Sequence, residues 1–142
     1  MALKSCIYLS FKGQCEAAFT FYERHLGGTV GNMFRYGGSP MAGDVPPGWD
    51  AKIMHGSIAI SGLMVLGADQ PPERYERPTG FQVFLETTDT AEAERVFAAL
   101  AENGTVHMPI QQTFWALRFG VVTDQFGIPW SINCEQTAEA PA

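Results

Sequence analysis

The chain has 142 residues, of which 46% are hydrophobic and 17% are charged, a balance typical of one globular domain with a packed core. Fifteen acidic and nine basic residues give a formal net charge of −6, which opposes binding to a nucleic-acid backbone. The three cysteines are widely spaced and form no CxxC pair, and no run approaches the roughly 20 apolar residues that span a bilayer. We therefore expect a cytoplasmic protein with reduced thiols and no nucleic-acid or membrane partner.

The first half of the chain predicts one helix and four strands. In chain order these are a strand at 5–11, a helix at 16–26, and strands at 29–36, 52–60 and 63–67, with a Gly/Pro-rich loop over 37–50. Ile7, Leu9 and Phe11 alternate on one face of the first segment, as in a half-buried strand. Ser61-Gly62 separates the last two strands and is a two-residue signal for a hairpin turn. The predicted order is βαβββ.

The second half predicts the same order. Its elements are a strand at 81–85, a helix at 90–102, and strands at 105–110, 114–122 and 128–134. Asp89 stands at the N-cap position of the helix, and Glu92 three residues later completes a capping-box-like pattern. Two βαβββ halves form an internal repeat, and each half alone exposes a sheet face that needs covering. This order predicts an α+β fold in which two βαβββ modules form a curved mixed sheet around a cleft.

These elements set the expected domain boundaries. We expect a single domain over 1–135, with a first module at about 4–68 and a second at about 80–134. The last residues, 136–142, are small or polar and show no periodicity, so they are expected to form a disordered tail.

Two groups of motifs resemble one known family. The first group is YLSFKGQCEAA at 8–18, FY at 21–22 and LGG at 26–28, which resembles the opening strand and helix of the vicinal-oxygen-chelate superfamily. The second is QTFWA at 112–116, FG at 119–120, VTD at 122–124, FG at 126–127 and PWSIN at 129–133. This combination resembles the PhnB-like branch of the superfamily. The superfamily also includes the glyoxalases and the bleomycin-resistance proteins. The resemblance covers nearly the whole chain.

The resemblance implies a homodimer and a pocket inside each curved sheet, where members bind a divalent metal or a small ligand. Metal-dependent members place one ligand early in the first strand of each module and another in its last strand. Here Cys6 or Ile7 occupies the early position, and the segment 64–66 offers Met, Val and Leu where a carboxylate would lie. Ser131 stands where many members carry Glu. The expected metal is therefore weakly held or absent.

His55 and Gln82 are the remaining candidates for metal or pocket ligands. His55 interrupts an apolar strand, and a neutral imidazole can bind a metal or transfer a proton near neutral pH. Its alternative role is a half-buried side chain bonded to the backbone. Gln82 lies either in the pocket or on a solvated strand face. Two such groups fall short of the three or four protein ligands of a tight divalent site.

The second module supplies the other pocket candidates. Phe114, Trp115 and Trp130 are aromatic side chains of the kind that line ligand pockets, and they also suit core or dimer packing. Arg118 could hold an anionic substrate with two hydrogen bonds, or lie exposed on its strand. Cys15 lies near a helix N-terminus, a position that lowers thiol pKa, but it has no evident partner base.

Two functions follow from these residues and from the resemblance, with catalytic residues unknown. The first is a small-molecule enzyme of unknown substrate, with a weakly held divalent metal acting as a Lewis acid where one is bound. The alternative is a non-catalytic protein that sequesters a small ligand, as the bleomycin-resistance proteins do. Metal-independent ligand binding would distinguish them. Whether the chain is an enzyme stays open at this point.

Overall fold

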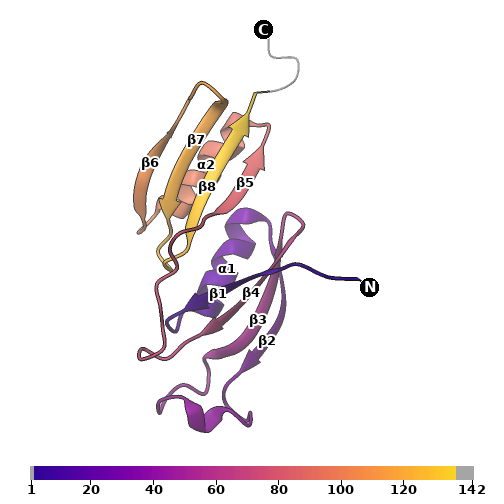
Figure 1. Ribbon diagram of the computed structural model, residues 1–142, viewed down its shortest axis with the longest axis vertical. Helices are drawn as coiled ribbons and strands as arrows, with labels where there is room; N and C mark the ends of the chain where they lie inside the picture. Colours follow the sequence, from indigo (N-terminus) through magenta and orange to yellow (C-terminus); the bar gives the residue numbers. More distant parts are fainter. Residues whose placement is uncertain (1, 137–142) are drawn as a thin grey trace. The chain divides into compact units, whose positions relative to one another are not determined.

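The computed structural model describes residues 2–136 and divides into two units on either side of the bond between Arg77 and Pro78. Within the described residues each unit contains one long helix and four strands in the order βαβββ (Figure 1). The N-terminal unit contains β1 (Ile7–Phe11), α1 (Cys15–Leu26), β2 (Thr29–Arg35), the short 3-10 helix η1 (Ala42–Asp44), β3 (Ile53–Ile60) and β4 (Leu63–Asp69). The C-terminal unit contains β5 (Val83–Thr87), α2 (Thr90–Ala101), β6 (Thr105–Gln111), β7 (Ala116–Thr123) and β8 (Pro129–Glu135).

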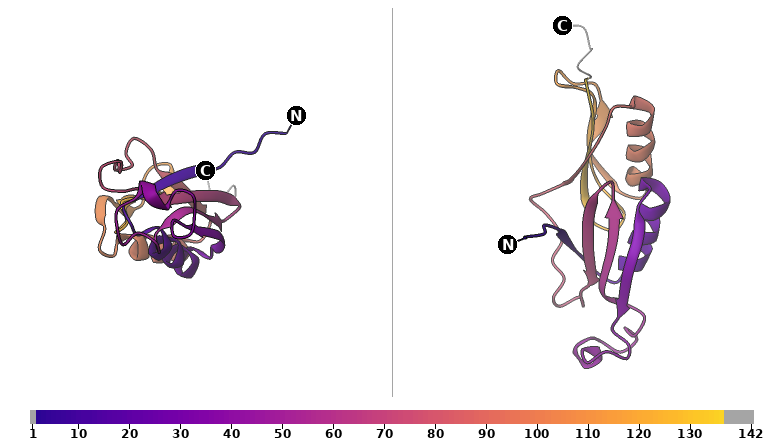
Figure 2. Two further views of the ribbon diagram at one scale, coloured as in Figure 1. Left: turned by 90° about the horizontal axis from the view of Figure 1, so that it is seen from below. Right: turned by 90° about the vertical axis from the view of Figure 1, so that its right-hand side faces the viewer.

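The two sheets have the same topology. The strand orders are β1-β4-β3-β2 and β5-β8-β7-β6. In each sheet the first and last strands of the unit pair in parallel, and the other neighbours are antiparallel. Each helix covers one face of its own sheet (Figure 2). The predicted α+β fold with two βαβββ modules is therefore confirmed. We call the sheet face opposite the helix the open face of each unit.

The core of the N-terminal unit lies between α1 and its sheet. Leu9, Phe11 and Ile58 are buried against the helix, as the alternation in the first strand predicts. The rings of Phe11 and Phe19 meet edge to face with centroids 5.8 Å apart. Gly67 allows this approach, because a Cβ atom there would lie 2.9 Å from the Phe19 ring. Each fully buried side chain of this size contributes about 1.5–3 kcal/mol through the hydrophobic effect.

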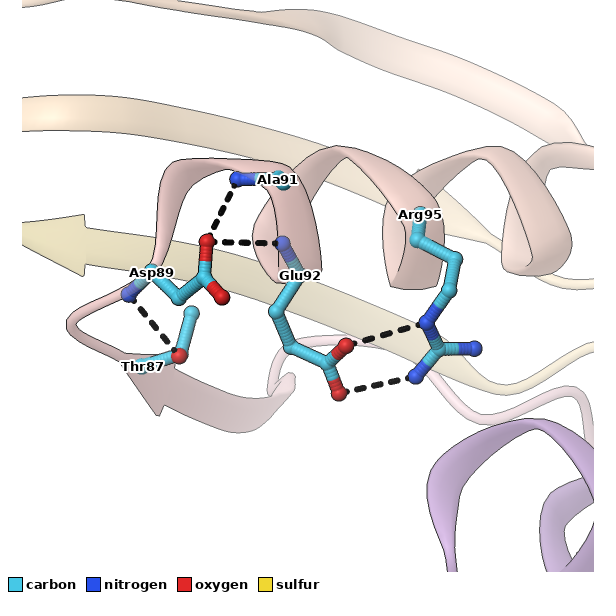
Figure 3. Close-up of polar contacts among 5 residues, drawn as sticks. All are labelled: Thr87, Asp89, Ala91, Glu92 and Arg95. Atoms are coloured by element: carbon cyan, nitrogen blue, oxygen red, sulfur yellow. Dashed lines mark hydrogen bonds and ion pairs between the residues drawn. The ribbon is translucent and has the colours of Figure 1, made fainter.

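Helix α2 begins at the predicted N-cap. The carboxylate of Asp89 accepts hydrogen bonds from the backbone N of Ala91 at 2.9 Å and of Glu92 at 3.4 Å (Figure 3). In a complete capping box the Glu92 carboxylate would accept from the backbone N of Asp89. Here Glu92 instead pairs with Arg95 at 2.8 Å, and the backbone N of Asp89 donates to Thr87 Oγ1. The N-cap is thus confirmed, and the reciprocal half of the predicted box is wrong.

Left-handed residues end the elements where the sequence predicted turns. Gly27 caps α1 with φ of 70°, and Asn103 follows α2 with φ of 58°. Ser61 and Gly62 both have positive φ, of 48° and 84°, as a two-residue hairpin of the primed type requires. Strand β4 runs to Asp69, two residues beyond its predicted end. Residues 137–142 of the predicted tail lie outside the described residues.

Candidate functional site

The open face of the N-terminal sheet carries polar and aromatic side chains between the core positions. Tyr8 lies between the helix-facing residues Ile7 and Leu9, so its ring points to the opposite side, where it is 50% exposed. Ala68 follows Gly67, which faces α1, and therefore belongs to the same open face as Tyr8. The side-chain period of two thus places the Tyr8 ring outside the core.

A cavity of about 400 Å³ lies over this face. Its lining includes two phenols, two methionines, an amide and a guanidinium: Tyr8, Tyr36, Met41, Met54, Gln70 and Arg74. Asp44 of η1 and Ala68 of β4 complete it. The sheet supplies one wall, and the loops after β2 and β4 supply the other. This volume falls within the range of pockets that bind small organic molecules.

Tyr8 and His55 form a hydrogen-bonded pair beside the cavity. The Tyr8 hydroxyl and His55 Nδ1 lie 3.0 Å apart, and their ring centroids lie 5.5 Å apart. Phe34 adds a third ring, 6.4 Å from that of His55. Partial burial raises the pKa of the Tyr8 hydroxyl, so this group stays protonated at neutral pH. The pair therefore joins a neutral phenol to an imidazole, a combination that can exchange a proton with a bound molecule.

Tyr36 is fixed at the other side of the cavity. It is buried, and its hydroxyl donates to the backbone O of Asp69 at 2.8 Å. Burial raises the pKa of Tyr36, although the nearby Arg74 guanidinium acts in the opposite direction. Tyr36 and Arg74 both line the cavity.

Arg74 brings a positive charge to the cavity. Its loop turns after β4, where the backbone N of Arg74 donates to the backbone O of Pro71 at 2.9 Å. Within residues 2–136 its guanidinium makes one hydrogen bond, a long one of 3.4 Å to the backbone O of Asp44. A guanidinium carries five N–H donors, so most of them can bind a ligand.

Asp69 holds the strand end and the helix start together beneath the cavity. Its carboxylate accepts from the backbone N of Gly13 at 3.0 Å, of Cys15 at 2.8 Å and of Ile53 at 2.8 Å. The side chain is buried, and its oxygens are used by these structural hydrogen bonds. This carboxylate therefore fixes the backbone and does not face the cavity.

Comparison with known proteins identifies the family. The model of the Glyoxalase/Bleomycin resistance protein/Dioxygenase superfamily matches residues 8–132. The chain belongs to this superfamily. Protein YjdN of Escherichia coli K12 is 37% identical over 134 residues, which cover 89% of this chain and 91% of YjdN.

Solved structures of the superfamily share the fold. Protein PA1353 of Pseudomonas aeruginosa is 43% identical, has a TM-score of 0.84, and is matched over 96% of this chain and 100% of that protein. A PhnB protein of Bacillus cereus is 21% identical, with a TM-score of 0.79 over 92% and 98% of the two chains. At this identity, the second likeness shows the fold alone.

Members of the superfamily often use a divalent metal, but the donors of the N-terminal unit do not fit a tight site. In the described part of the chain, no three His, Cys, Asp or Glu side chains lie together as ligands of a metal ion would. The sequence suggested that β4 ends without a carboxylate, yet the strand continues to Asp69. The Asp69 carboxylate already accepts hydrogen bonds from three backbone N–H groups. His55 Nδ1 is hydrogen-bonded to the Tyr8 hydroxyl. His55 and Gln82 belong to different units.

The remaining predicted residues lie in the C-terminal unit. Gln82 is exposed just before β5, and Phe114 and Trp115 stack edge to face in the loop between β6 and β7, with centroids 5.0 Å apart. Arg118 donates to Glu94 of α2 at 2.7 Å. Trp130 is fully buried in the core.

Cys15 is buried at the start of α1. Burial raises the pKa of the Cys15 thiol, and the charge of Asp69 acts in the same direction, so this effect outweighs its position at a helix start. Among residues 2–136, no helix has the length and apolar content needed to cross a bilayer.

Sequence reasoning missed most of the cavity lining. Tyr8 gave a usable signal, because a large aromatic side chain on the polar face of an amphipathic strand needs an explanation. Arg74, Gln70 and Met41 gave none. They lie in loops, where no periodicity indicates the direction of a side chain.

Proposed function

We propose that this chain binds a small organic acid with an aromatic or apolar body in the cavity of its N-terminal unit, without requiring a metal. The observation that carries the proposal is the Arg74 guanidinium beside two tyrosines and two methionines in a cavity of about 400 Å³. A guanidinium can hold a carboxylate or phosphonate through two parallel hydrogen bonds.

The apolar part of the ligand has a matching surface. Met41 and Met54 are flexible side chains that adapt to irregular ligands. The rings of Tyr8, His55 and Phe34 extend this surface along the open face. Asp44 also lines the cavity, and its carboxylate would oppose an anion. The balance between Arg74 and Asp44 should therefore set the preference for charged ligands.

Calorimetric titration with matched probes tests this proposal. Benzoate and phenylphosphonate should bind more tightly than benzyl alcohol, which lacks the charge. Arg74→Gln should weaken binding of benzoate about ten- to a hundredfold, because a hydrogen bond to a charged group contributes about 1.5–3 kcal/mol. Asp44→Asn should strengthen it. Arg77→Gln, at an exposed position just beyond the same loop, is the matched control. Equal benzoate affinity in the Arg74 and Arg77 variants would refute the proposal.

A second function, supported by the Tyr8–His55 hydrogen bond, is acid–base catalysis on the bound acid. His55 would remove a proton from a carbon next to a carbonyl group, and Tyr8 would orient the imidazole. Phenylpyruvate in D₂O is a suitable probe, because NMR follows exchange of its acidic C–H without net reaction. His55→Gln and Tyr8→Phe should reduce exchange to the buffer rate while calorimetry still detects binding. Exchange at the buffer rate with the unaltered protein would exclude this function for phenylpyruvate.

The assembly and location of the chain are also proposals. We propose that both modules form one domain over 1–135 and that the protein is a homodimer in the cytoplasm. The exposed ring of Phe114, at 92%, supports an apolar interface, and the free cysteines Cys6, Cys15 and Cys134 suit a reducing compartment. Light scattering that returns the monomer mass at micromolar concentration would contradict the dimer.

A further inference from the structure

The open face of the C-terminal sheet places a carboxylate, an amide and an aromatic ring in one row. Gly120 faces α2, since a Cβ atom there would lie 2.6 Å from the Phe97 ring. Its neighbour Phe119 therefore points to the open face. The strand register aligns Glu86 of β5 with Asn133 of β8, and Asn133 with Phe119 of β7. These three side chains lie side by side across the middle of the sheet.

Apolar side chains surround this row. The next row aligns Phe84 with Ser131, and Ser131 with Val121. Phe84 is 54% exposed, and the Trp115 ring lies 5.3 Å from that of Phe119. The Glu86 carboxylate therefore lies within an exposed, largely aromatic surface. Aromatic faces attract organic cations.

One side-chain atom of Asn133, the oxygen Oδ1, has no hydrogen-bond partner among the described residues. Its side chain is buried, and its Nδ2 donates to Glu86 Oε2 at 2.9 Å. Its Oδ1 is enclosed and accepts no hydrogen bond from the described residues. A flipped amide would place Oδ1 against the carboxylate, so that two acceptors would face each other. The amide orientation is therefore fixed, and the site lacks a donor.

The nearest basic residue of β7 does not neutralise Glu86. Arg118 is aligned with Cys134 and belongs to the helix-facing side of the sheet. Its Nε donates to Glu94 of α2 at 2.7 Å. Within residues 2–136, the Glu86 carboxylate is therefore not paired with the Arg118 guanidinium.

We propose that this face binds the protonated amino group of a small aromatic amine. The ammonium group would donate one hydrogen bond to the Glu86 carboxylate and a second to Asn133 Oδ1, while the aromatic body lies over Phe84 and Phe119. An ammonium group has the positive charge and the several donors that this pair of acceptors requires. Because Oδ1 is enclosed, side chains beside it must move for the amine to enter. This site uses none of the residues that line the N-terminal cavity.

Titration of the full-length chain with two cations tests the proposal. Benzylammonium should bind at least about tenfold more tightly than benzyltrimethylammonium, which keeps the ring and the charge but has no N–H donor. In ¹⁵N-edited spectra, the side-chain amide signal of Asn133 should shift with benzylammonium and not with benzyl alcohol. This comparison uses the unaltered protein and does not depend on the folding of a variant. Equal affinity for the two cations, or an unchanged Asn133 signal, would overturn the proposal.

Substitutions distinguish an amine site at Asn133 Oδ1 from a site that holds only a buried water molecule. Glu86→Gln should weaken benzylammonium binding about ten- to a hundredfold, while Glu102→Gln, at the exposed end of α2, should not. Asn133→Leu should also weaken binding. If Asn133→Leu raises the thermal stability and leaves the affinity unchanged, Oδ1 accepts from water alone and the proposal fails. Arg74→Gln should leave benzylammonium binding intact, so failure of the N-terminal site would be recognised separately.

Discussion

Replacement of Asp69 by alanine would remove the acceptor of three backbone N–H groups in the N-terminal unit. The carboxylate bonds to the backbone N of Gly13, Cys15 and Ile53 at 2.8–3.0 Å, and the side chain is 1% exposed. A buried donor left without a partner costs about 1–3 kcal/mol. Gly13 is part-buried, so water can restore part of its loss. We expect the free energy of unfolding to fall by about 3–6 kcal/mol, a large share of the total for a small domain.

Urea unfolding followed by circular dichroism measures this loss. Asp69→Asn retains one acceptor oxygen and should lose less than Asp69→Ala. Asp50→Ala is the matched control, because Asp50 is exposed. A loss below about 1 kcal/mol in Asp69→Ala would refute the reasoning that these hydrogen bonds hold β4 to the start of α1.

Three further predictions concern stability. Burial raises the pKa of Cys15, so above about pH 8.5 the unfolded chain loses this proton while the folded chain keeps it. The free energy of unfolding should then fall by up to about 1.4 kcal/mol per pH unit between pH 8 and 9.5, and Cys15→Ala should reduce that slope in urea titrations. Asp89→Ala should lose about 1 kcal/mol in thermal unfolding, because it removes the N-cap of α2. Gly104→Ala should lower the free energy of unfolding by about 1–3 kcal/mol in the same assay, because the added Cβ atom would meet the backbone O of Thr123. Gly43→Ala is the control and should change it little, because a Cβ atom there has open space.

The fold could be predicted because its buried residues recur at the periods of strands and helices. The first strand and the cap of α2 follow directly from such patterns. The start of β7 was predicted too early, since Phe114 and Trp115 have high strand propensity. In the structure Thr113 Oγ1 accepts from the backbone N of Trp115 and Ala116, at 3.3 and 3.1 Å. This local turn holds both aromatic residues in a loop before the strand begins.

The candidate site was less predictable because its residues come together through tertiary structure. His55 stood out as a polar interruption of an apolar strand, and the structure places it beside the cavity. Its role as a ligand residue stays a prediction. Arg74 could not be selected from the sequence, because its position depends on the turn after β4 and on contact with the backbone of Asp44. The hydrogen bonds of the Asp69 carboxylate could not be predicted from the sequence either, because they depend on where Gly13 and Ile53 lie in the fold.

The two modules show why a shared topology does not fix a shared chemistry. Helix-facing positions must fill a core at high density, so apolar residues recur there in both units, as with Leu9 and Trp130. Open-face positions do not pack against the helix, and their side chains differ between the two units. The N-terminal face carries the Tyr8–His55 pair near a guanidinium, whereas the C-terminal face carries Glu86 bonded to Asn133. Opposite ligand charges should therefore distinguish the two faces, with benzoate responding to Arg74→Gln and benzylammonium to Glu86→Gln.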